Sequence, residues 1–403
     1  MAEAARALAP GEFDSRPGFR TLARVLGTDE GESRVVGGAI RDALLGLPVS
    51  DIDFATRLRP EEIVRRLEAA RIRAVPTGLK HGTVTAVIGD TPYEVTTLRH
   101  DVATDGRHAT VAFTDDWQAD AARRDFTINA LYGDPSSGTV WDWFDGLADL
   151  ETRTVRFIGD PYQRIAEDHL RILRFFRFSA RFSDRLEPEG LAASAARAND
   201  LMALSRERIR EELLKLLAAP DPAPVAQAMV QHGLFRPVLP EVTDEGVGRL
   251  RRLIEAEALA QIRPDPLRRL AALLPPKPWL GREMAGRLRL SRSDSKRLEA
   301  ALGWEAPLPR DPRALAHAVG GLPALDRMLI AGDPRAADWA PVLSSWRSPR
   351  MPVSGRDLIA MGIPPGPDVS RLLGDVERRW VAAGFPSSRA ETLAIARESL
   401  GKV

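Results

Sequence analysis

The pattern of apolar and polar positions changes about one third of the way along the chain. Before residue 150, short runs rich in β-branched residues alternate with turn residues, which predicts strands at both ends of residues 35–54 and at 83–88 and 91–98. Apolar residues at helical spacing predict helices at 19–26 and 60–70. The polar stretch 99–112 predicts a mobile loop.

Beyond about residue 160, the apolar spacing is helical almost to the end of the chain. It predicts helices at 167–178, 206–217, 225–232, 245–262, 265–274, 281–302, 311–319, 322–331, 355–361 and 368–383. We therefore predict an α+β protein, with a small mixed β-sheet in an N-terminal domain and α-helices in everything that follows.

Composition narrows the class of protein without naming it. The chain has 403 residues, of which 44% are hydrophobic and 28% charged, as expected of a globular protein. It has no cysteine, which excludes disulfides, thiolate zinc sites and a cysteine nucleophile. We expect no signal peptide and no membrane span, and hence a cytoplasmic location. A net charge of +1 does not by itself indicate nucleic-acid binding.

A two-glycine turn and two nearby carboxylates form the first candidate site. Gly37 and Gly38 follow the first predicted strand, and because glycine has no Cβ, the backbone can pass close to a bulky anion. A predicted helix starts there, and its N–H groups and Arg41 add positive charge that suits a phosphate. Asp51 and Asp53 are two apart on the next predicted strand, so their carboxylates face the same way. Carboxylates beside a phosphate site predict Mg²⁺ and two-metal catalysis.

The order and spacing of these residues resemble the nucleotidyltransferase signature of the polymerase-beta superfamily. The stretch is most similar to class II tRNA nucleotidyltransferases (CCA-adding enzymes) and bacterial poly(A) polymerases. The resemblance implies that Asp51 and Asp53 are catalytic ligands of Mg²⁺, and that Gly38 and Arg41 hold the nucleotide triphosphate. Glu94, on a later predicted strand, is a candidate third catalytic carboxylate; the alternative is a strand residue paired with an arginine.

Three other segments of the predicted head also resemble the family, and the last two bear on which member this is. In Arg123-Arg124-Asp125, the resemblance makes Arg124 the arginine that contacts the nucleotide. Residues 77–84 resemble the corresponding segment of CCA-adding enzymes more than the arginine-rich one of bacterial poly(A) polymerases. The predicted loop around 101–108 resembles the flexible loop that full CCA-adding enzymes need for the last A.

Residues 167–178 carry a third match and read as one helix. Charged residues recur in it every three positions, at Asp168, Arg171, Arg174 and Arg177. At 3.6 residues per turn this line drifts about half a turn over nine residues, so the four cannot face one flat partner. By resemblance to a base-selecting Glu-Asp-x-x-Arg motif, Asp168 accepts from the amino group that C and A share and Arg171 donates to their ring acceptors. Arg174 and Arg177 then contact the nucleotide; the alternative is a helix with a charged surface.

The resemblance implies four regions. They are a helical lead-in at 1–33, a nucleotidyltransferase head at 34–150, a helical neck for base recognition at 151–220, and a helical body and tail that bind tRNA at 221–403.

The function implied is template-independent addition of CCA to tRNA 3′ ends from CTP and ATP, with release of pyrophosphate. Two kinds of alternative stay open. One is another nucleotidyltransferase of the superfamily, namely an A-adding enzyme, a CC-adding enzyme or a poly(A) polymerase. The other is a non-catalytic RNA-binding protein, which would have no chemical need of the carboxylate pair. The oligomeric state is not predicted.

Overall fold

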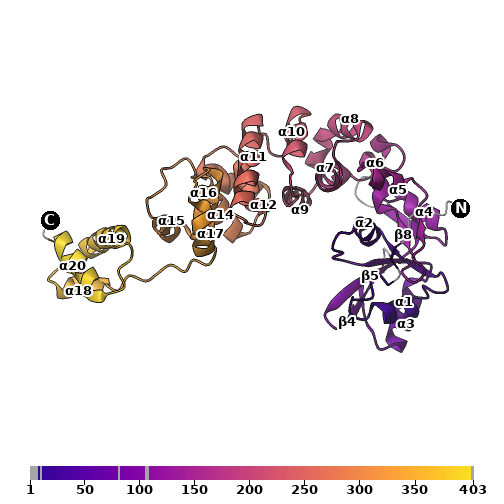
Figure 1. Ribbon diagram of the computed structural model, residues 1–403, viewed down its shortest axis with the longest axis horizontal. Coiled ribbons are helices and arrows are strands. Elements are labelled where there is room, and N and C mark those ends of the chain that lie inside the picture. The colour runs from indigo at the N-terminus through magenta and orange to yellow at the C-terminus, as the bar shows by residue number, and fades with distance from the viewer. Residues whose placement is uncertain (1–7, 10, 80–81, 105–108, 401–403) are drawn as a thin grey trace. The chain divides into compact units, whose positions relative to one another are not determined.

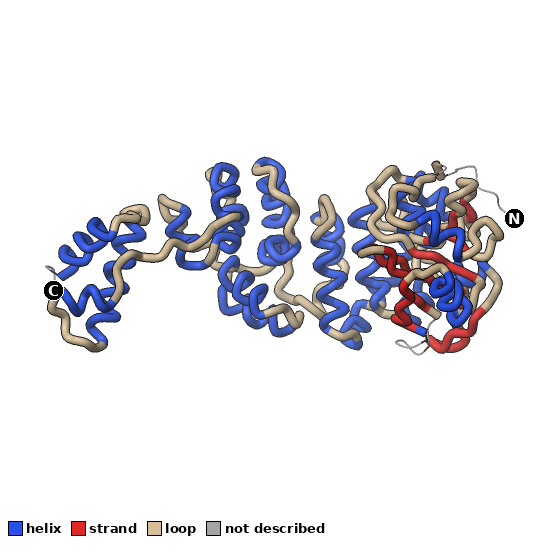
Figure 2. The backbone as a smooth tube through the Cα atoms, turned by 90° about the horizontal axis from the view of Figure 1, so that it is seen from below, coloured by secondary structure: helices blue, strands red, loops and turns tan. Residues whose placement is uncertain are grey.

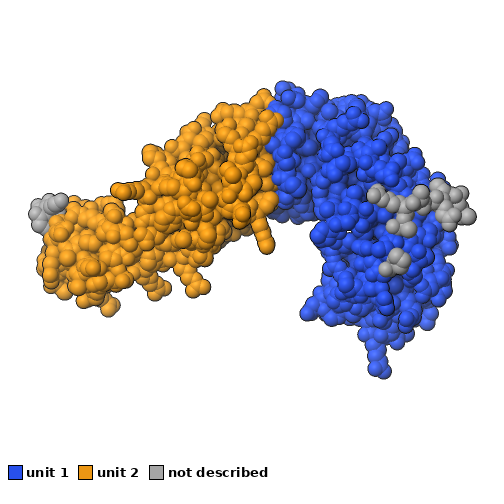
Figure 3. Space-filling view, viewed as in Figure 1, with its two compact units in different colours: residues 1–238 blue, residues 239–403 orange. Residues whose placement is uncertain are grey.

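The chain forms two compact units, residues 1–238 and residues 239–403 (Figure 3). The computed structural model describes residues 8–9, 11–79, 82–104 and 109–400. All its strands belong to the first unit, and the second consists of helices and loops (Figure 2). The predicted α+β class is therefore confirmed. Lys80 and His81, within the segment that resembled CCA-adding enzymes, lie outside the described residues.

Within the described residues, a mixed sheet of seven strands forms the centre of the N-terminal part (Figure 1). The strands are β1 (Ser33–Val36), β2 (Asp53–Thr56), β3 (Arg73–Gly78), β4 (Thr83–Ile88), β5 (Thr91–Thr97), β8 (Tyr132–Gly133) and β9 (Val140–Trp141). Their order is β3-β4-β5-β2-β1-β8-β9, in which only the β2–β5 pair is parallel. The strands at 83–88 and 91–98 were predicted from the sequence, whereas β3 was not.

The apolar face of this sheet explains why Asp53 points toward a site. Helices α1 (Phe19–Val25) and α3 (Pro60–Ala69) cover this face: α3 packs on β3, β4 and β5, and α1 contacts α3. The ring of Phe19 stacks on that of Phe54 at 5.7 Å between centroids. Since successive strand residues face opposite ways, Asp53 lies on the other face of β2 from Phe54.

The prediction of a loop at 99–112 is wrong for most of the segment. The described parts form a separate two-stranded sheet of β6 (Arg99–Thr104) and β7 (Ala109–Phe113). Their antiparallel register runs from Arg99 opposite Phe113 to Thr104 opposite Ala109. Both segments contain β-branched residues, and the pairing satisfies backbone groups that a loop would leave to water.

The rest of the first unit is helical, and one predicted helix is broken. Its helices are α2 (Gly38–Leu44), α4 (Trp117–Ala122), α5 (Gly146–Glu151), α6 (Pro161–Glu167), α7 (Leu170–Phe182), α8 (Pro188–Ala196), α9 (Arg206–Leu217) and α10 (Ala223–Gln231). The helix predicted at 167–178 is confirmed from Leu170 onward, but its start is wrong, because α6 ends before Asp168 and α7 begins at Leu170. Asp168 has extended backbone angles, and its carboxylate accepts a 3.1 Å hydrogen bond from the Leu170 N–H just inside α7. Ser205 caps the start of α9, the helix predicted at 206–217.

The second unit contains α11 (Asp244–Leu259), α12 (Pro266–Leu273), α13 (Pro278–Arg287), α14 (Arg292–Ala301), α15 (Pro312–Val319), α16 (Gly321–Ile330), α17 (Ala336–Ser344), α18 (Gly355–Ala360), α19 (Pro367–Ala382) and α20 (Arg389–Leu400). The one helix predicted at 281–302 is two, because Arg289 takes a positive φ of 51° and Ser291 caps the start of α14. The helices α4, α5, α6, α8, α17 and α20 were not predicted. Across the described residues, no helix combines the length and the apolar character that crossing a bilayer requires.

Candidate active site

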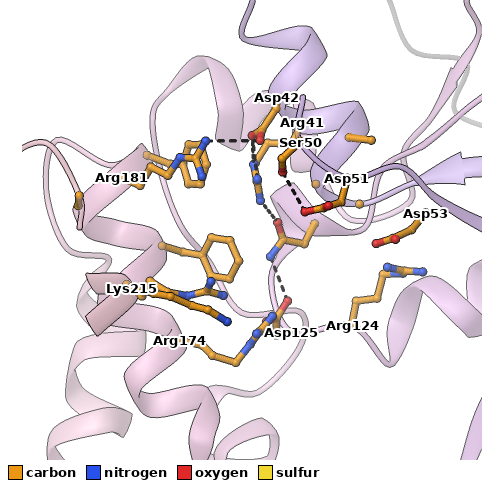
Figure 4. Close-up of a pocket in the computed structure, with 18 of the residues that line it drawn as sticks. Arg41, Asp42, Ser50, Asp51, Asp53, Arg124, Asp125, Arg174, Arg181 and Lys215 are labelled. Carbon is orange, nitrogen blue, oxygen red and sulfur yellow. Dashed lines mark hydrogen bonds and ion pairs between the residues drawn. The ribbon is translucent and has the colours of Figure 1, made fainter. Parts of the chain in front are cut away.

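A pocket of about 780 Å³ in the first unit collects most of the residues singled out from the sequence (Figure 4). Its volume is in the range typical of small-molecule sites. The lining includes nine of the ten predicted residues: Gly38, Arg41, Asp51, Asp53, Arg124, Asp168, Arg171, Arg174 and Arg177. Residues as far apart in sequence as Gly38 and Arg177, 139 positions, thus meet in one cavity.

The glycine turn is held in a backbone conformation that other residues rarely adopt. Gly37 has a φ of +71°, and its N–H donates a 2.9 Å hydrogen bond to the carbonyl of Leu131. A Cβ on Gly37 would lie 3.4 Å from Nη1 of Arg124. At Gly38 an added Cβ would meet only Arg41 Nη2, at an ordinary 3.5 Å. The chain itself therefore leaves space at Gly38, which suits a ligand passing close to the backbone.

The two aspartates lie together at the wall of the pocket. The sequence predicted that Asp51 and Asp53 both lie on the strand. For Asp51 this is wrong, because β2 begins at Asp53 and Asp51 lies in the loop before it. Partial removal from water and the neighbouring carboxylates of Glu94 and Asp51, opposed by Arg124, raise the pKa of Asp53 to about 6. Burial and the two carboxylates both disfavour the charged form of Asp53, and the positive charge of Arg124 does not offset them.

Glu94 is close to the aspartates but does not line the pocket. It lies on β5 opposite Asp53 in the parallel pair, and its side chain is exposed to solvent. Among the described residues, no group of three or more histidine, cysteine, aspartate or glutamate side chains is placed to hold a metal ion. A catalytic or metal-binding role for Glu94 therefore stays a prediction.

Arg124 is fixed by two partners behind the pocket wall. Its Nε donates to the Tyr132 hydroxyl at 3.0 Å, and its Nη2 lies 3.3 Å from the Asp120 carboxylate, which is 1% exposed. The Tyr132 hydroxyl donates to the same carboxylate at 2.5 Å. Burial acts to lower the pKa of Arg124, but Tyr132 and Asp120 outweigh it and raise that pKa. The guanidinium is thus held charged and in one orientation.

Each nitrogen of the Arg41 guanidinium already has a partner within the protein. It is 5% exposed, donates to Asp42 at 2.8 Å through Nε, and donates to Oδ1 of Asn129 at 2.5 Å through Nη1. Asn129 in turn donates to Asp125 at 3.1 Å. The predicted contact of Arg41 with the triphosphate stays a prediction, since in the structure the guanidinium orders its neighbours.

A series of polar contacts connects helix α2, which follows the glycine turn, to helix α7 (Figure 4). At one end Arg174 of α7 donates to Asp125 at 2.7 Å. At the other end Arg181 of α7 lies 3.5 Å from Asp42 of α2. The hydrogen bonds fix the position of the two helices that form opposite sides of the pocket.

The two residues predicted to read the base each have a partner that orients them. The carboxylate of Asp168 accepts from Nη2 of Arg208 on α9, at 3.1 and 2.9 Å. Arg171 donates through Nη1 to Glu167 at 2.5 Å and to the Arg164 carbonyl at 2.7 Å. Because Asp168 lies off the helix, the drift expected along a single helix does not separate it from the arginines, and all four residues reach the pocket.

Several lining residues were not predicted. Phe178 and Phe182 stack on each other at 6.1 Å, and the guanidinium groups of Arg177 and Arg41 lie 4.2 and 4.1 Å from their respective rings. Arg181 continues the helical spacing of the α7 arginines, so the sequence contained a signal for it. Lys215 on α9 had no local signal, because only packing of α9 against α7 brings it to the pocket.

These features define the class of protein as a nucleotidyltransferase with a polymerase-type head. Residues 33–156 match the family model described as the poly A polymerase head domain, and residues 185–245 match one described as a probable RNA and SrmB-binding site of polymerase A.

The relatives identify the family within that class. The chain is 35% identical to the mitochondrial CCA tRNA nucleotidyltransferase 1 of Danio rerio, over 96% of this chain and 93% of that protein. It is 32% identical to the CCA-adding enzyme of Levilactobacillus brevis, over 96% and 98% of the two chains. The structure of the Bacillus stearothermophilus CCA-adding enzyme in complex with CTP is similar with a TM-score of 0.74 and 28% identity, covering 96% of this chain and 99% of that one.

The chain therefore belongs to the family of CCA tRNA nucleotidyltransferases, the CCA-adding enzymes. The predicted resemblance and the prediction of a nucleotidyltransferase of tRNA are confirmed.

Proposed function

We propose that this chain adds CCA to the 3′ ends of tRNA from CTP and ATP and releases pyrophosphate. One observation carries the proposal at the level of the site. A single pocket contains the aspartate pair, the glycine turn and the Asp168–Arg171 pair, so one bound nucleotide can reach all three. The relatives named CCA-adding enzymes support the same assignment over nearly the whole chain.

In the reaction, the 3′-hydroxyl of the RNA attacks the α-phosphate of the nucleotide. A new phosphodiester bond forms, the bond between the α- and β-phosphates breaks, and the hydroxyl loses its proton. Gly38 and Arg124 bind the triphosphate, the first by close approach of its backbone and the second as an oriented cation. Because attacking and leaving oxygens must be in line, the pyrophosphate leaves on the side opposite to the incoming hydroxyl.

Selection between bases follows from the donors and acceptors of Asp168 and Arg171. An aspartate only accepts and an arginine only donates, so the pair matches the amino group and ring nitrogen of C or A and mismatches U and G. A wrong base would leave buried polar groups unpaired, which costs about 1–3 kcal/mol per group. Arg208 and Glu167 keep the two side chains oriented before the nucleotide binds. Arg174 and Arg177 are proposed to contact the nucleotide beside them.

The aspartate pair fits Mg²⁺. Burial raises the pKa of Asp53 most, and the neighbouring carboxylates of Glu94 and Asp51 raise it further, an effect that a bound cation would oppose. Mg²⁺ prefers one or two carboxylates together with phosphate oxygens and waters. When bound between Asp51, Asp53 and the nucleotide, Mg²⁺ would activate the hydroxyl and stabilise the leaving pyrophosphate. We propose Mg²⁺ as the cofactor and the cytoplasm as the compartment. The four regions given above remain our proposed division of labour.

Three tRNA transcripts test the function, ending before CCA, after C and after CC. Each is incubated with Mg²⁺ and CTP, ATP or both, and the products are sized at single-nucleotide resolution. We expect two C and then one A, with no further growth. Addition of A alone to the CC-ended transcript would show an A-adding enzyme, and addition that stops at CC would show a CC-adding one. A long A ladder would show a poly(A) polymerase, and no extension would favour the RNA-binding alternative.

A further inference from the structure

One wall of the pocket has no part in binding the nucleotide as proposed above. It is formed by the last turn of α7 and the last turn of α9, and its charged residues are Arg181 and Lys215. Figure 4 shows both on the side of the pocket away from Asp51 and Asp53. The reaction needs a second substrate beside the nucleotide, and the proposed function gives this wall no other role.

The two cations of this wall are poorly neutralised compared with the other cations of the pocket. Arg174 and Arg177 have carboxylate oxygens at 2.6 and 2.8 Å. Arg181 has its carboxylate partner, Asp42, at 3.5 Å, and its side chain is 49% exposed. Among the described residues, no acidic group lies within ion-pair distance of Lys215, which is exposed to the pocket. Cations left in this state are available to an anionic ligand.

A second hollow continues from this wall. Its volume is about 470 Å³, and it shares Arg181 and Pro220 with the pocket. Arg153 and Arg185 also line it, as do two carboxylates: Asp184, which pairs with Arg153 at 2.8 Å, and Asp221. Because Arg181 and Pro220 line both hollows, the two lie next to each other, and together we call them the path; its basic residues are Lys215, Arg181, Arg153 and Arg185.

We infer that this path holds the single-stranded 3′ end of the RNA, with Lys215 and Arg181 binding the last internucleotide phosphate and Arg185 a phosphate further from the end. The inference rests on the proposed function. Its physical reason is the in-line geometry of phosphoryl transfer, which requires the hydroxyl to approach from the side opposite to the departing pyrophosphate. Gly38 and Arg124 hold the triphosphate beside the aspartates, so the RNA enters past the wall that faces them. A basic groove that follows the backbone is the usual way in which proteins hold a single strand.

The first test is the exchange Lys215→Ala, assayed with a CC-ended tRNA and ATP. We expect the KM for the RNA to rise about tenfold or more, as for a lost hydrogen bond to a charged group, while the KM for ATP and kcat at saturating RNA stay within about twofold. The salt dependence of RNA binding should lose about one unit of slope, and Lys215→Arg should restore most of the affinity. Arg65→Ala is the matched control, because Arg65 is 71% exposed and pairs with Glu62 on α3.

The second test uses RNA length. With Arg185→Glu, we expect weaker binding of a tRNA or hairpin RNA but no change with a dinucleotide primer, which has no phosphate at the outer position. Lys215→Ala should weaken both. Thermal unfolding of each variant checks that the fold is kept.

Three outcomes would overturn the inference. The KM for RNA could be unchanged in Lys215→Ala, or the KM for ATP could rise with it, which would place the lysine at the nucleotide. If Lys215→Ala changes inhibition by added pyrophosphate relative to the wild-type protein but leaves the KM for RNA constant, the path is an exit for the product. An inactive wild-type protein would refute the proposed function itself, which separates the two failures.

Discussion

Buried arginine–carboxylate networks occur in both units, but they are balanced differently. In the second unit, Arg268 lies between Glu257 and Asp326 at 2.8 Å from each, and all three side chains are 1–3% exposed. Arg269 and Arg297 complete this cluster, at 2.9 and 2.7 Å from the same two carboxylates. It joins α11, α12, α14 and α16, so its visible role is to hold helices together.

In the first unit, the network is open to a cavity and has an excess of positive charge. The described lining of the pocket contains seven arginine and lysine side chains and five aspartates. A buried ion pair is by itself weak evidence of either stability or function. What distinguishes the pocket is that some of its charged groups lack partners within the protein, so a ligand has to supply them.

The largest effect should come from the aspartate pair. We expect Asp53→Asn to reduce nucleotide transfer at least about a thousandfold, because a neutral amide is a poor ligand for Mg²⁺. Single-turnover extension of a CC-ended tRNA measures it, with thermal unfolding to show that the fold is kept. Glu94→Gln is the matched control, and we expect a much smaller loss because Glu94 does not line the pocket. An equal loss in both variants would make Glu94 a full member of the metal site.

In the second unit, breaking the buried network should lower the stability of the fold. Arg268→Ala leaves two buried carboxylates short of a partner, and we expect it to lower the free energy of unfolding by about 3 kcal/mol or more. The exposed pair Arg371–Asp368 on α19 is the control, and Arg371→Ala should cost at most about 0.5 kcal/mol. Urea unfolding followed by circular dichroism compares the two. If the two substitutions cost the same, the buried cluster is not a support of the fold.

Base selection should suffer most from the loss of Arg171. We expect Arg171→Ala to lower discrimination against UTP and GTP by about ten- to a hundredfold, with a smaller change in the affinity for the triphosphate. Arg208→Ala should also lower discrimination against UTP and GTP, but by less, since it frees the Asp168 carboxylate without removing it. Misincorporation measured with each nucleotide alone is the readout. Unchanged discrimination in Arg171→Ala would exclude a base-reading role.

The smallest effect concerns pH. The pKa of Asp53 is raised to about 6, so the folded protein binds this proton more tightly than the unfolded chain does. Without metal, the stability that this group contributes is therefore lost as pH rises from about 4 to 6. At limiting Mg²⁺, the rate of nucleotide transfer should decrease as the pH falls below about 6. Saturating Mg²⁺ should shift this decrease to lower pH, because the cation stabilises the carboxylate. If the decrease in rate at low pH does not shift with Mg²⁺ concentration, it is due to the titration of another group.

Local sequence determined the elements that carry the chemistry. The glycine turn, the aspartate pair and the strands at 83–88 and 91–98 depend on neighbouring residues, and each was predicted from them. The family could be recognised for the same reason, because its motifs are short and keep their spacing. Most predicted helices were located, although their ends moved by a few residues.

Tertiary structure decided what no local pattern contains. Pairing of β6 with β7 turned a predicted loop into a sheet, and the contact of Asp168 with Arg208 accompanies a break in a predicted helix. Arg297 pairs with the carboxylates of Asp265 and Asp326, so the structure uses its charge to join helices. Lys215 reaches the pocket only because α9 packs on α7. A sequence lists charges, whereas burial and the partners of each charge arise from contacts between distant segments, and these decide which charges remain for a ligand.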